Sequence, residues 1–536
     1  MVLLWLDINS SYAHSSFALP SIHAQVSGKE WQWHVVSGTV HTPYNQFIKE
    51  AVRLQPDVIA ATAWLFTHDR LVEVVSRIKA LLPQTYIILG GPEFLGNNEV
   101  YLRTHPYINA LFRGEGEEIF PQWLKNWEKP EIRNRLTGIC TLDKLGSYHD
   151  NGMAKVQRFK TLVPPENSPF FHIDKPFVQI ETTRGCFNDC YFCVSGEDKP
   201  VRTIPVEQIR SRLHTLVNKG VKEIRVLDRT FNANPKRTKA LCALFREFTG
   251  TIRFHIEIHP AILTTSIIDI LEDIPNGLLH IEAGIQSLDD HVLASSGRIG
   301  NSHSAIEAIR RLKACNRFEM HADLIAGLPN YTLSRLKEDI KKLISLGLDE
   351  IQLETLKLLP GTKMRNQAAS FGISYAPLPP YEVLSTPSMP PEALYEALQL
   401  SRLLDGWHNG HSEWHKPFVQ LTLDNSCFLD TFLHHLMQKQ LLEQPLSAEH
   451  RGLLLYDFCR IHYPTFLPEI SAAWIAAGYS LKKAPGLQAV PYKNLKNNNP
   501  DIQFYHLSAP SGNYWFGFDR KVERRKPVLT LRNKPE

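Results

Sequence analysis

Residues 177–193 read FVQIETTRGCFNDCYFC, and this stretch decides how the rest of the chain is interpreted. A run of apolar and β-branched residues predicts a strand that leads directly into a loop carrying Cys186, Cys190 and Cys193. Thiolates at the spacing C-x3-C-x2-C can hold a [4Fe–4S] cluster on one short loop. Because only three ligands are supplied, the fourth iron is left open to a substrate or cofactor.

A zinc site is the alternative interpretation of the three thiols. A structural zinc ion needs four ligands in a closed tetrahedron. His172 is the nearest candidate for the fourth ligand, but it lies across the predicted strand from the loop. The chain also has no second C-x2-C pair, so the sequence favours the iron–sulfur cluster.

A series of alternating strands and helices follows the cysteine loop. The strand-like segments are FVQIETT, EIRVLD, RFHIEIH, LLHIEAG, MHADLIAG and DEIQLETLKLL, with helical patterns such as VEQIRSRLHTLVNKG between them. Six βα units of this kind predict a partial barrel of the TIM type, in which function resides at the carboxyl ends of the strands.

The residues ahead of the loop predict a separate α/β domain. The short apolar runs MVLLWLDI, DVIAATAW, YIILGG and ALFRGEG each end in a small or polar turn, and a helical pattern separates the middle two. This alternation predicts a doubly wound parallel sheet whose ligands bind beyond the carboxyl ends of the strands. Those ends fall at residues 9–11, 62–67, 90–93 and 114–117.

The fold class predicted for the whole chain is therefore α/β, with a final region of helices. Between the two α/β regions, Asp150–Gly152 has the composition of a hairpin turn. The predicted boundaries are a Rossmann-like domain at 1–130, a hairpin and linker at 131–176, a partial (β/α)6 TIM-type barrel at 177–375, and a mainly helical accessory domain at 376–536.

Composition limits the class of protein. The chain has 536 residues and a formal net charge of +4, so no field of one sign points to nucleic acid or an anionic membrane as a partner. No apolar run reaches the roughly 20 residues of a membrane helix, and the N-terminus lacks the basic region of a signal peptide. The cysteines outside the loop are scattered, unlike a disulfide framework. The sequence predicts a cytoplasmic protein.

The cysteine loop resembles the signature of the radical S-adenosylmethionine (SAM) superfamily, including the aromatic Phe192 before the last cysteine. The resemblance implies that SAM chelates the open iron and is cleaved to a 5′-deoxyadenosyl radical, with an electron donor such as flavodoxin or ferredoxin. The strand ends that resemble the family's SAM contacts contribute Phe192, Glu257, Glu282, Gln286, Arg298 and Ile325. The family's glycine-rich GGE segment is absent, and residues 227–232 stand in its place.

Two glycine-containing segments of the first domain resemble the cobalamin-binding domain of the cobalamin-dependent radical SAM class. The candidate cobalamin contacts are Thr62, Gly90, Gly91, Pro92, Glu93, Gly114, Glu115, Gly116 and Glu117. The Asp-x-His-x-x-Gly motif that supplies a histidine to cobalt in other proteins is absent, and His14 and His68 lack its context. The resemblance therefore implies base-off, His-off cobalamin.

Together these resemblances imply a methyltransferase that adds a methyl group from methylcobalamin to an unactivated carbon. Ring formation or rearrangement with the same cofactors stays open as an alternative. So does a cobalamin-free enzyme like the tRNA methylthiotransferases, although those carry further cysteines in the first domain, where this chain has none before Cys140. A non-catalytic cobalamin or iron–sulfur carrier is the third alternative. The expected substrate is an unidentified small molecule.

Overall fold

The computed structural model describes residues 1–28, 30–409, 412–479, 490–491, 502–509, 512–519, 526–527 and 529–531. The chain divides into two compact units. The first consists of Met1–Glu319, Gly327–Tyr331 and Leu356–Pro390, and the second of Met320–Ala326, Thr332–Thr355 and Pro391–Glu536. Among the described residues, no helix has both the length and the apolar character needed to cross a membrane.

The first unit begins with a seven-stranded sheet of order β2-β1-β3-β4-β5-β6-β7. Its strands are β1 (Val2–Asn9), β2 (Gln32–Thr39), β3 (Val58–Thr62), β4 (Tyr86–Gly90), β5 (Ala110–Phe112), β6 (Ile139–Leu142) and β7 (Tyr148–Asp150). The first five are parallel, and β6 and β7 are antiparallel additions. The order 2-1-3-4-5 is doubly wound with its switch point between β1 and β3, which confirms the predicted class of this domain.

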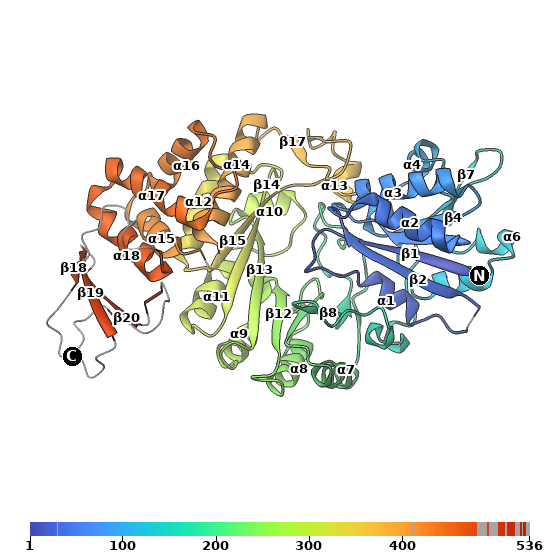
Figure 1. Cartoon of the computed structure of the whole chain (residues 1–536), viewed down its shortest axis with the longest axis horizontal. Helices are drawn as coiled ribbons and strands as arrows, with labels where there is room; N and C mark the ends of the chain where they lie inside the picture. Colours follow the sequence, from blue (N-terminus) through green and yellow to red (C-terminus); the bar gives the residue numbers. More distant parts are fainter. Residues whose placement is uncertain are drawn as a thin grey trace. The chain divides into compact units, whose positions relative to one another are not determined.

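Helices cover both faces of this sheet (Figure 1). They are α1 (Ala18–His23), α2 (Tyr44–Leu54), α3 (His68–Leu81), α4 (Glu99–Thr104), α5 (Ile119–Lys125) and α6 (Pro130–Arg133). Successive side chains of a strand point to opposite faces. Leu4 and Leu6 of β1 accordingly pack with α2 and α3, whereas Leu3 and Trp5 pack with α1 and α5. The alternation explains why β1 is apolar along almost its whole length.

The predicted hairpin turn is wrong in position. The hairpin joins β6 to β7 through residues 143–147, where the Asp143 carboxylate accepts hydrogen bonds from the backbone N–H groups of Leu145 and Ser147. Asp150 is instead the last residue of β7, and Asn151 and Gly152 follow that strand. An Asp side chain that accepts hydrogen bonds from the backbone of its own loop stabilises a turn as effectively as an Asn-Gly pair does, and Asp143 has this role here.

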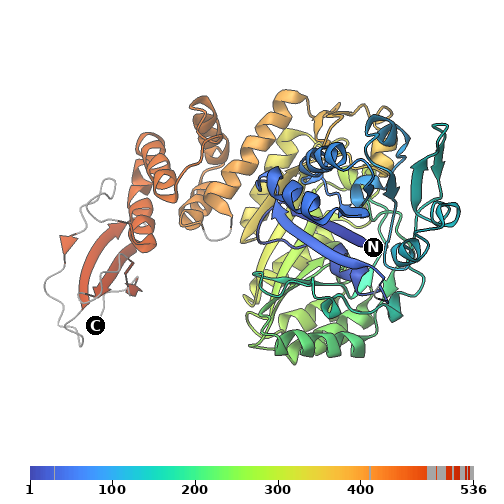
Figure 2. The same ribbon diagram turned by 45° about the vertical axis from the view of Figure 1, so that its right-hand side comes forward.

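The rest of the first unit contains the cysteine loop and four parallel strands in the order β13-β12-β11-β8. The strands are β8 (Val178–Ile180), β11 (Glu223–Val226), β12 (Arg253–Ile258) and β13 (Leu279–Gln286). Helices α7 (Val206–Asn218), α8 (Pro235–Arg246), α9 (Thr265–Glu272), α10 (Asp290–Ser295) and α11 (Ser302–Ala314) alternate with them (Figure 2). Smaller elements are β9 (Thr183–Arg184), β10 (Arg202–Thr203), α13 (Lys363–Asn366), β16 (Ser374–Tyr375) and β17 (Val383–Ser385).

Alternation along β12 separates its structural side chains from its polar ones. Phe254, Ile256 and Ile258 are buried, and the Phe254 ring stacks on Phe245 of α8 with ring centroids 3.9 Å apart. The intervening Glu257 lies on the other face, directly opposite Glu282 of β13 in the strand register. One face of the strands is thus fixed by helix packing, which leaves the other for polar chemistry.

The second unit contains two parallel strands, a group of helices and an antiparallel sheet. The parallel pair is β14 (Glu319–Ala326) and β15 (Glu350–Thr355); one helix connects the two strands, and the other helices follow β15 in the chain. The helices are α12 (Leu333–Ser345), α14 (Pro391–Leu403), a π-helix (Leu404–His408), α15 (His415–Asp424), α16 (Phe428–Gln438), α17 (Ala448–His462) and α18 (Leu467–Ala477). The sheet contains β18 (Val490–Pro491), β19 (Ile502–Ala509), β20 (Gly512–Asp519) and β21 (Leu529–Leu531).

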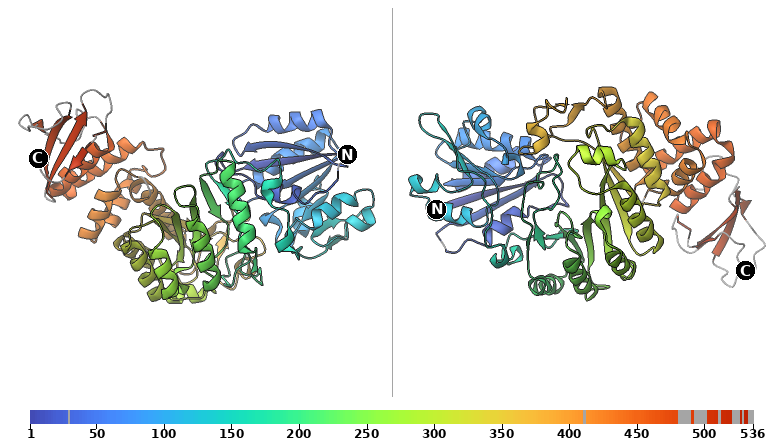
Figure 3. Two further views of the ribbon diagram at one scale, coloured as in Figure 1. Left: turned by 90° about the horizontal axis from the view of Figure 1, so that it is seen from below. Right: turned by 180° about the vertical axis from the view of Figure 1, so that it is seen from behind.

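The described part of the C-terminal region is mainly helical, as predicted, and the antiparallel sheet is an addition. Helix α18 packs against the β19–β20 hairpin through Ile475, Leu507 and Phe516 (Figure 3). Ile325, a predicted SAM contact, lies half-buried on β14 of this unit.

Candidate functional site

A cavity of about 530 Å³ in the first unit is lined by two groups of residues that are far apart in sequence. One group comes from the strand ends of the first sheet: Thr62, Gly90, Gly91, Pro92, Gly114, Glu115, Gly116 and Glu117. The other comes from around the cysteine loop: Gln179, Glu181, Thr183, Arg184, Gly185, Ser195, Asp198, Leu227 and Arg229. The fold therefore brings eight of the nine predicted cobalamin contacts to a cavity that they share with the cysteine loop.

Gly91 shows why the cavity wall needs glycine. Its φ is +112°, and a Cβ atom there would lie 2.5 Å from the carbonyl oxygen of Ala63. A Cβ on Gly90 would make only ordinary contact with Phe112 at 3.4 Å. Gly91 is thus required by the close packing of the β4 end on the β3 end, and this packing leaves backbone rather than side chains at the cavity wall.

Glu93 is the predicted cobalamin contact that does not line the cavity. Its side chain is buried and accepts a hydrogen bond from the Tyr381 hydroxyl. Burial raises the pKa of Glu93, against the lowering effect of this hydrogen bond. A tyrosine 288 residues away satisfies the carboxyl group, and no local sequence pattern could have revealed that partner.

The two histidines of the first domain have different surroundings. His68 is buried, and its two ring nitrogens contact Asp69 at 2.8 Å and the Tyr101 hydroxyl at 2.9 Å, so it has a structural role. His14 is exposed and lines the cavity, with Nδ1 2.7 Å from the Ser11 hydroxyl. No other histidine is among the described residues that line the cavity.

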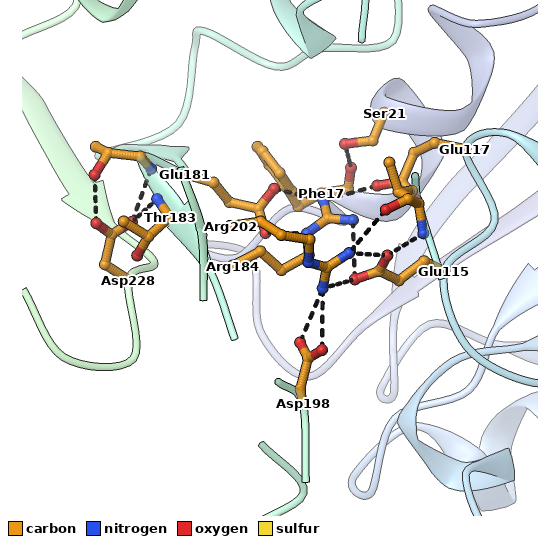
Figure 4. Close-up of polar contacts among 12 residues, drawn as sticks. Phe17, Ser21, Glu115, Glu117, Glu181, Thr183, Arg184, Asp198, Arg202 and Asp228 are labelled. Carbon is orange, nitrogen blue, oxygen red and sulfur yellow. Dashed lines mark hydrogen bonds and ion pairs between the residues drawn. The ribbon is translucent and has the colours of Figure 1, made fainter. Parts of the chain in front are cut away.

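Carboxylates and arginines form a connected network beside the cavity (Figure 4). Arg202 donates to both oxygens of Glu115 at 2.7 Å, and Arg184 donates to Glu117 at 2.8 Å and to Glu181 at 2.6 Å. Burial lowers the pKa of Arg184, but Glu117 and Glu181 outweigh it and raise the value overall. The carboxylates of Glu115 and Glu117, predicted as cofactor contacts, are therefore already paired with arginine.

Hydrogen-bond donors surround the three thiols. The backbone N–H of Asn188 donates to the Cys186 Sγ at 3.4 Å, and the N–H of Ser195 donates to the Cys193 Sγ at 3.4 Å. The third thiol, Cys190, accepts from Arg298 at 3.6 Å. Hydrogen bonds to sulfur are among the means by which proteins tune iron–sulfur clusters.

The thiol geometry favours a cluster over a single ion. The three Sγ atoms do not form a group within 4.8 Å of one another, whereas the ligands of one tetrahedral zinc ion would. Burial raises the pKa of Cys190 to about 11, and the positive charge of Arg298 opposes this rise. His172, the candidate fourth zinc ligand, instead lies 3.5 Å from Asp174. One buried and two half-buried thiols, each with a donor directed at its sulfur, fit a [4Fe–4S] cluster.

The predicted SAM contacts on β12 and β13 lie near one another. Glu257 is raised in pKa to about 7, first by burial and then by the charge of Glu282, while Arg229 and Arg298 lower it. Glu282 itself is held by the His255 Nε2 atom at 2.8 Å. Like charges opposite each other in a sheet disfavour joint ionisation, so Glu257 is poised to titrate near neutrality.

Gln286 and Arg298 pack on Gly284 at the end of β13. Arg298 donates to the Gly284 carbonyl oxygen, and a Cβ on Gly284 would lie 3.2 Å from Gln286 Nε2. The Gln286 Oε1 atom is buried and accepts no hydrogen bond from the described residues. A buried acceptor without a donor is costly unless a ligand supplies one, which fits the predicted SAM site. Phe192 is half-buried on the cysteine loop.

The segment that replaces the family's GGE sequence has a clear structural role. The buried Asp228 carboxylate accepts from the backbone N–H groups of Thr182 and Thr183 at 2.7 and 2.8 Å, and also from the Thr182 hydroxyl. These bonds fix the strand that leads into the cysteine loop. The adjacent Arg229 is exposed and lines the cavity, and sequence reasoning did not single it out as a site residue.

Family comparison agrees with this geometry. Residues 6–124 match the B12 binding domain family, and residues 180–343 match the Radical SAM superfamily. The chain contains a B12-binding domain followed by a radical SAM domain. These two matches confirm the resemblance inferred from the cysteine loop and the glycine segments. Residues of both domains line the cavity.

Two similar proteins are methyltransferases by name. An uncharacterized methyltransferase, PH0819, of Pyrococcus horikoshii is 25% identical over 338 residues, which are 60% of this chain and 71% of that protein. The cobalamin-dependent radical SAM methyltransferase TokK of Streptomyces tokunonensis is 21% identical over 396 residues, or 67% of this chain. That match spans only 57% of TokK.

Solved structures resemble this chain over most of its length. The cobalamin-dependent SAM radical enzyme OxsB, with aqua-cobalamin and SAM bound, has a TM-score of 0.60 and 16% identity. The match covers 88% of this chain and 78% of OxsB. At this identity the comparison establishes the fold.

Proposed function

We propose that this protein is a cobalamin-dependent radical SAM methyltransferase. One observation carries the proposal: the strand ends of the B12-binding domain and the residues around Cys186 line the same cavity. A methyl donor and a radical generator must act on one substrate, so their binding residues have to converge as they do here. The methyltransferase names of the two relatives favour methyl transfer over ring formation.

The chain's own residues have distinct tasks in this proposal. Cys186, Cys190 and Cys193 would hold the cluster, and Gly90–Pro92 with Gly114–Gly116 would form the backbone wall for the corrin. Glu257, Gln286 and Arg298 would orient SAM. When bound, SAM at the cluster supplies a 5′-deoxyadenosyl radical and cobalamin supplies the methyl group. The protein contributes orientation, charge and exclusion of water, with a flavodoxin or ferredoxin as electron donor and a small molecule as substrate.

We also propose that cobalamin binds base-off and without a histidine ligand. His14 makes this testable, because it is the one histidine among the described residues lining the cavity and a hydrogen bond to Ser11 occupies its Nδ1. The electron paramagnetic resonance spectrum of bound cob(II)alamin should lack nitrogen hyperfine splitting from imidazole. A splitting that disappears in His14→Ala would refute the proposal for the lower axial ligand.

The decisive experiment uses SAM labelled in its methyl group. Anaerobically reconstituted protein with cobalamin and reductant should form deoxyadenosine and transfer label to cobalamin, and Cys190→Ala should form no deoxyadenosine. Deoxyadenosine without labelled cobalamin would support the ring-forming or rearranging alternative. Folded, cluster-loaded protein that cleaves SAM but retains no cobalamin would support the methylthiotransferase-like alternative. Absence of deoxyadenosine with SAM bound would support a carrier.

A further inference from the structure

The acidic residues at the end of β5 are committed to partners outside their own domain's strands. Both Glu115 oxygens accept from Arg202, and one of them also accepts from the Val156 N–H at 2.5 Å. Glu118 similarly accepts from the backbone N–H groups of Gln157 and Arg158. The backbone of this segment lines the cavity while its carboxylates point to other segments. The segment therefore connects the end of β5 to residues 156–158 and to Arg202.

Arg184 connects the same acidic segment to the cysteine loop. It lies two residues before Cys186 and contacts three carboxylates: Glu115 at 3.4 Å, Glu117 at 2.8 Å and Glu181 at 2.6 Å. The side chains of Arg184 and Glu117 are only 15% and 9% exposed. Ion pairs that are this sheltered are screened little by solvent. Removal of one partner therefore leaves the other as an unpaired, largely buried charge.

The network is held in one orientation. The guanidinium groups of Arg184 and Arg202 both lie over the Phe159 ring, 4.8 and 5.8 Å from its centroid. Arg202 also contacts Asp198 of the cysteine loop at 3.0 Å. Planar bidentate pairing and stacking restrict an arginine in a way that a lysine cannot reproduce. The arrangement thus transmits a fixed geometry as well as binding energy.

We propose that Glu115, Glu117, Arg184 and Arg202 form a positioning element that sets the separation and orientation of the corrin wall relative to the cluster loop. The inference rests on the proposed function, because it assumes that cobalamin and the cluster occupy the sites assigned to them. It gives the acidic residues of the Gly114–Glu117 segment a role different from cofactor contact. The covalent connection is short, since Arg184 is separated from the ligand Cys186 only by Gly185.

Magnetic coupling between two unpaired spins provides a readout that a merely structural role would not change. Bound cob(II)alamin and the reduced cluster each carry an unpaired spin, and their dipolar interaction depends steeply on distance and orientation. The test compares the wild type with two variants. Glu115→Gln keeps the shape of the side chain but removes its negative charge, and Arg184→Lys keeps the positive charge but removes the planar guanidinium group. Arg246→Lys is the matched control, because Arg246 pairs with Asp273 at 2.9 Å on an exposed surface.

In reconstituted protein, we expect Glu115→Gln and Arg184→Lys to broaden or shift the spin–spin coupling while iron content and cobalamin occupancy stay at wild-type levels. Transfer of the methyl group from SAM to cob(I)alamin should fall roughly 10- to 100-fold, as small displacements of reacting groups do. Arg246→Lys should match wild type. Should Glu115→Gln fail to fold, Glu117→Gln removes one of the negative charges paired with Arg184 and is expected to act in the same direction.

Two failures remain distinguishable. If the wild type retains no cobalamin or no cluster, the proposed function fails. If it retains both and the variants show wild-type coupling and wild-type methyl transfer, the positioning element is overturned. An Arg184→Lys variant that equals wild type, beside a defective Glu115→Gln, would also overturn it, because charge alone would then be sufficient.

Discussion

The raised pKa of Glu257 leads to a prediction about SAM binding. SAM carries a sulfonium charge and an ammonium group, so an ionised Glu257 should attract it more strongly than a neutral one. Because the pKa of Glu257 is about 7, the neutral form prevails below pH 7 and the ionised form is gained as pH rises through 7. SAM affinity should therefore increase from pH 6 to pH 8.

The magnitude follows from the fraction of Glu257 that is ionised. With a pKa of about 7, that fraction rises about tenfold between pH 6 and pH 8, and the apparent dissociation constant should fall by the same factor. SAM's own α-amino group titrates with an ordinary pKa of about 7.7–8.0, so the wild-type profile alone is ambiguous. The ratio of wild type to Glu257→Gln at each pH cancels this contribution of the ligand.

Equilibrium binding of SAM to cluster-loaded protein is the assay. Glu257→Gln should bind SAM weakly with a flatter pH profile. Glu307→Gln, at a half-exposed residue paired with Arg310, should retain the wild-type profile. A raised carboxyl pKa also means that folding stability is lost as pH rises through 7. Without SAM, Glu257→Gln should therefore melt above wild type at pH 8. A ratio of affinities independent of pH would refute the reasoning.

Three further predictions concern the framework. Gly91→Ala should lower the free energy of unfolding by about 2–4 kcal/mol in chemical denaturation, because its Cβ meets the Ala63 carbonyl at positive φ; a wild-type midpoint would contradict this. Asp228→Asn should lower the free energy of unfolding by about 1–3 kcal/mol, because an amide cannot accept all the hydrogen bonds of the carboxylate. Unchanged thermal stability would argue against a structural role for Asp228. Cys190→Ala should abolish bound iron and sulfide while Cys427→Ser, at an exposed cysteine, retains both; the reverse pattern would remove Cys190 from the ligand set.

Sequence periodicity predicted the architecture because it reflects burial along each element. The run Val2–Asn9 is apolar on both faces since helices cover both, and βα alternation then fixed the parallel order. Glycine at residue 91 and the ends of β3, β4 and β5 were predictable for the same local reason. The three cysteines could be predicted as cluster ligands from their spacing alone.

Side-chain direction was not predictable, because it depends on distant partners. Glu115 pairs with an arginine 87 residues away, Glu117 with one 67 residues away, and Glu93 with Tyr381. Each carboxylate lies at or next to a strand end, where backbone pattern alone suggested ligand contact. Only tertiary structure reveals that Glu115 and Glu117 are paired with arginine and that Glu93 is hydrogen-bonded to a tyrosine.

Ligand candidates and structural groups within the site differ in whether the protein itself satisfies their hydrogen bonds. A buried polar atom must be paired, so an acceptor that the protein satisfies itself has no need of a cofactor. By that criterion the carboxylates of Glu115 and Glu117 are structural, whereas Gln286 Oε1 lacks a donor among the described residues and Arg229 lines the cavity without donating a hydrogen bond to them. Gln286 Oε1 is therefore a buried acceptor that a bound molecule can satisfy, whereas the exposed Arg229 is solvated and can also donate to a ligand in the cavity.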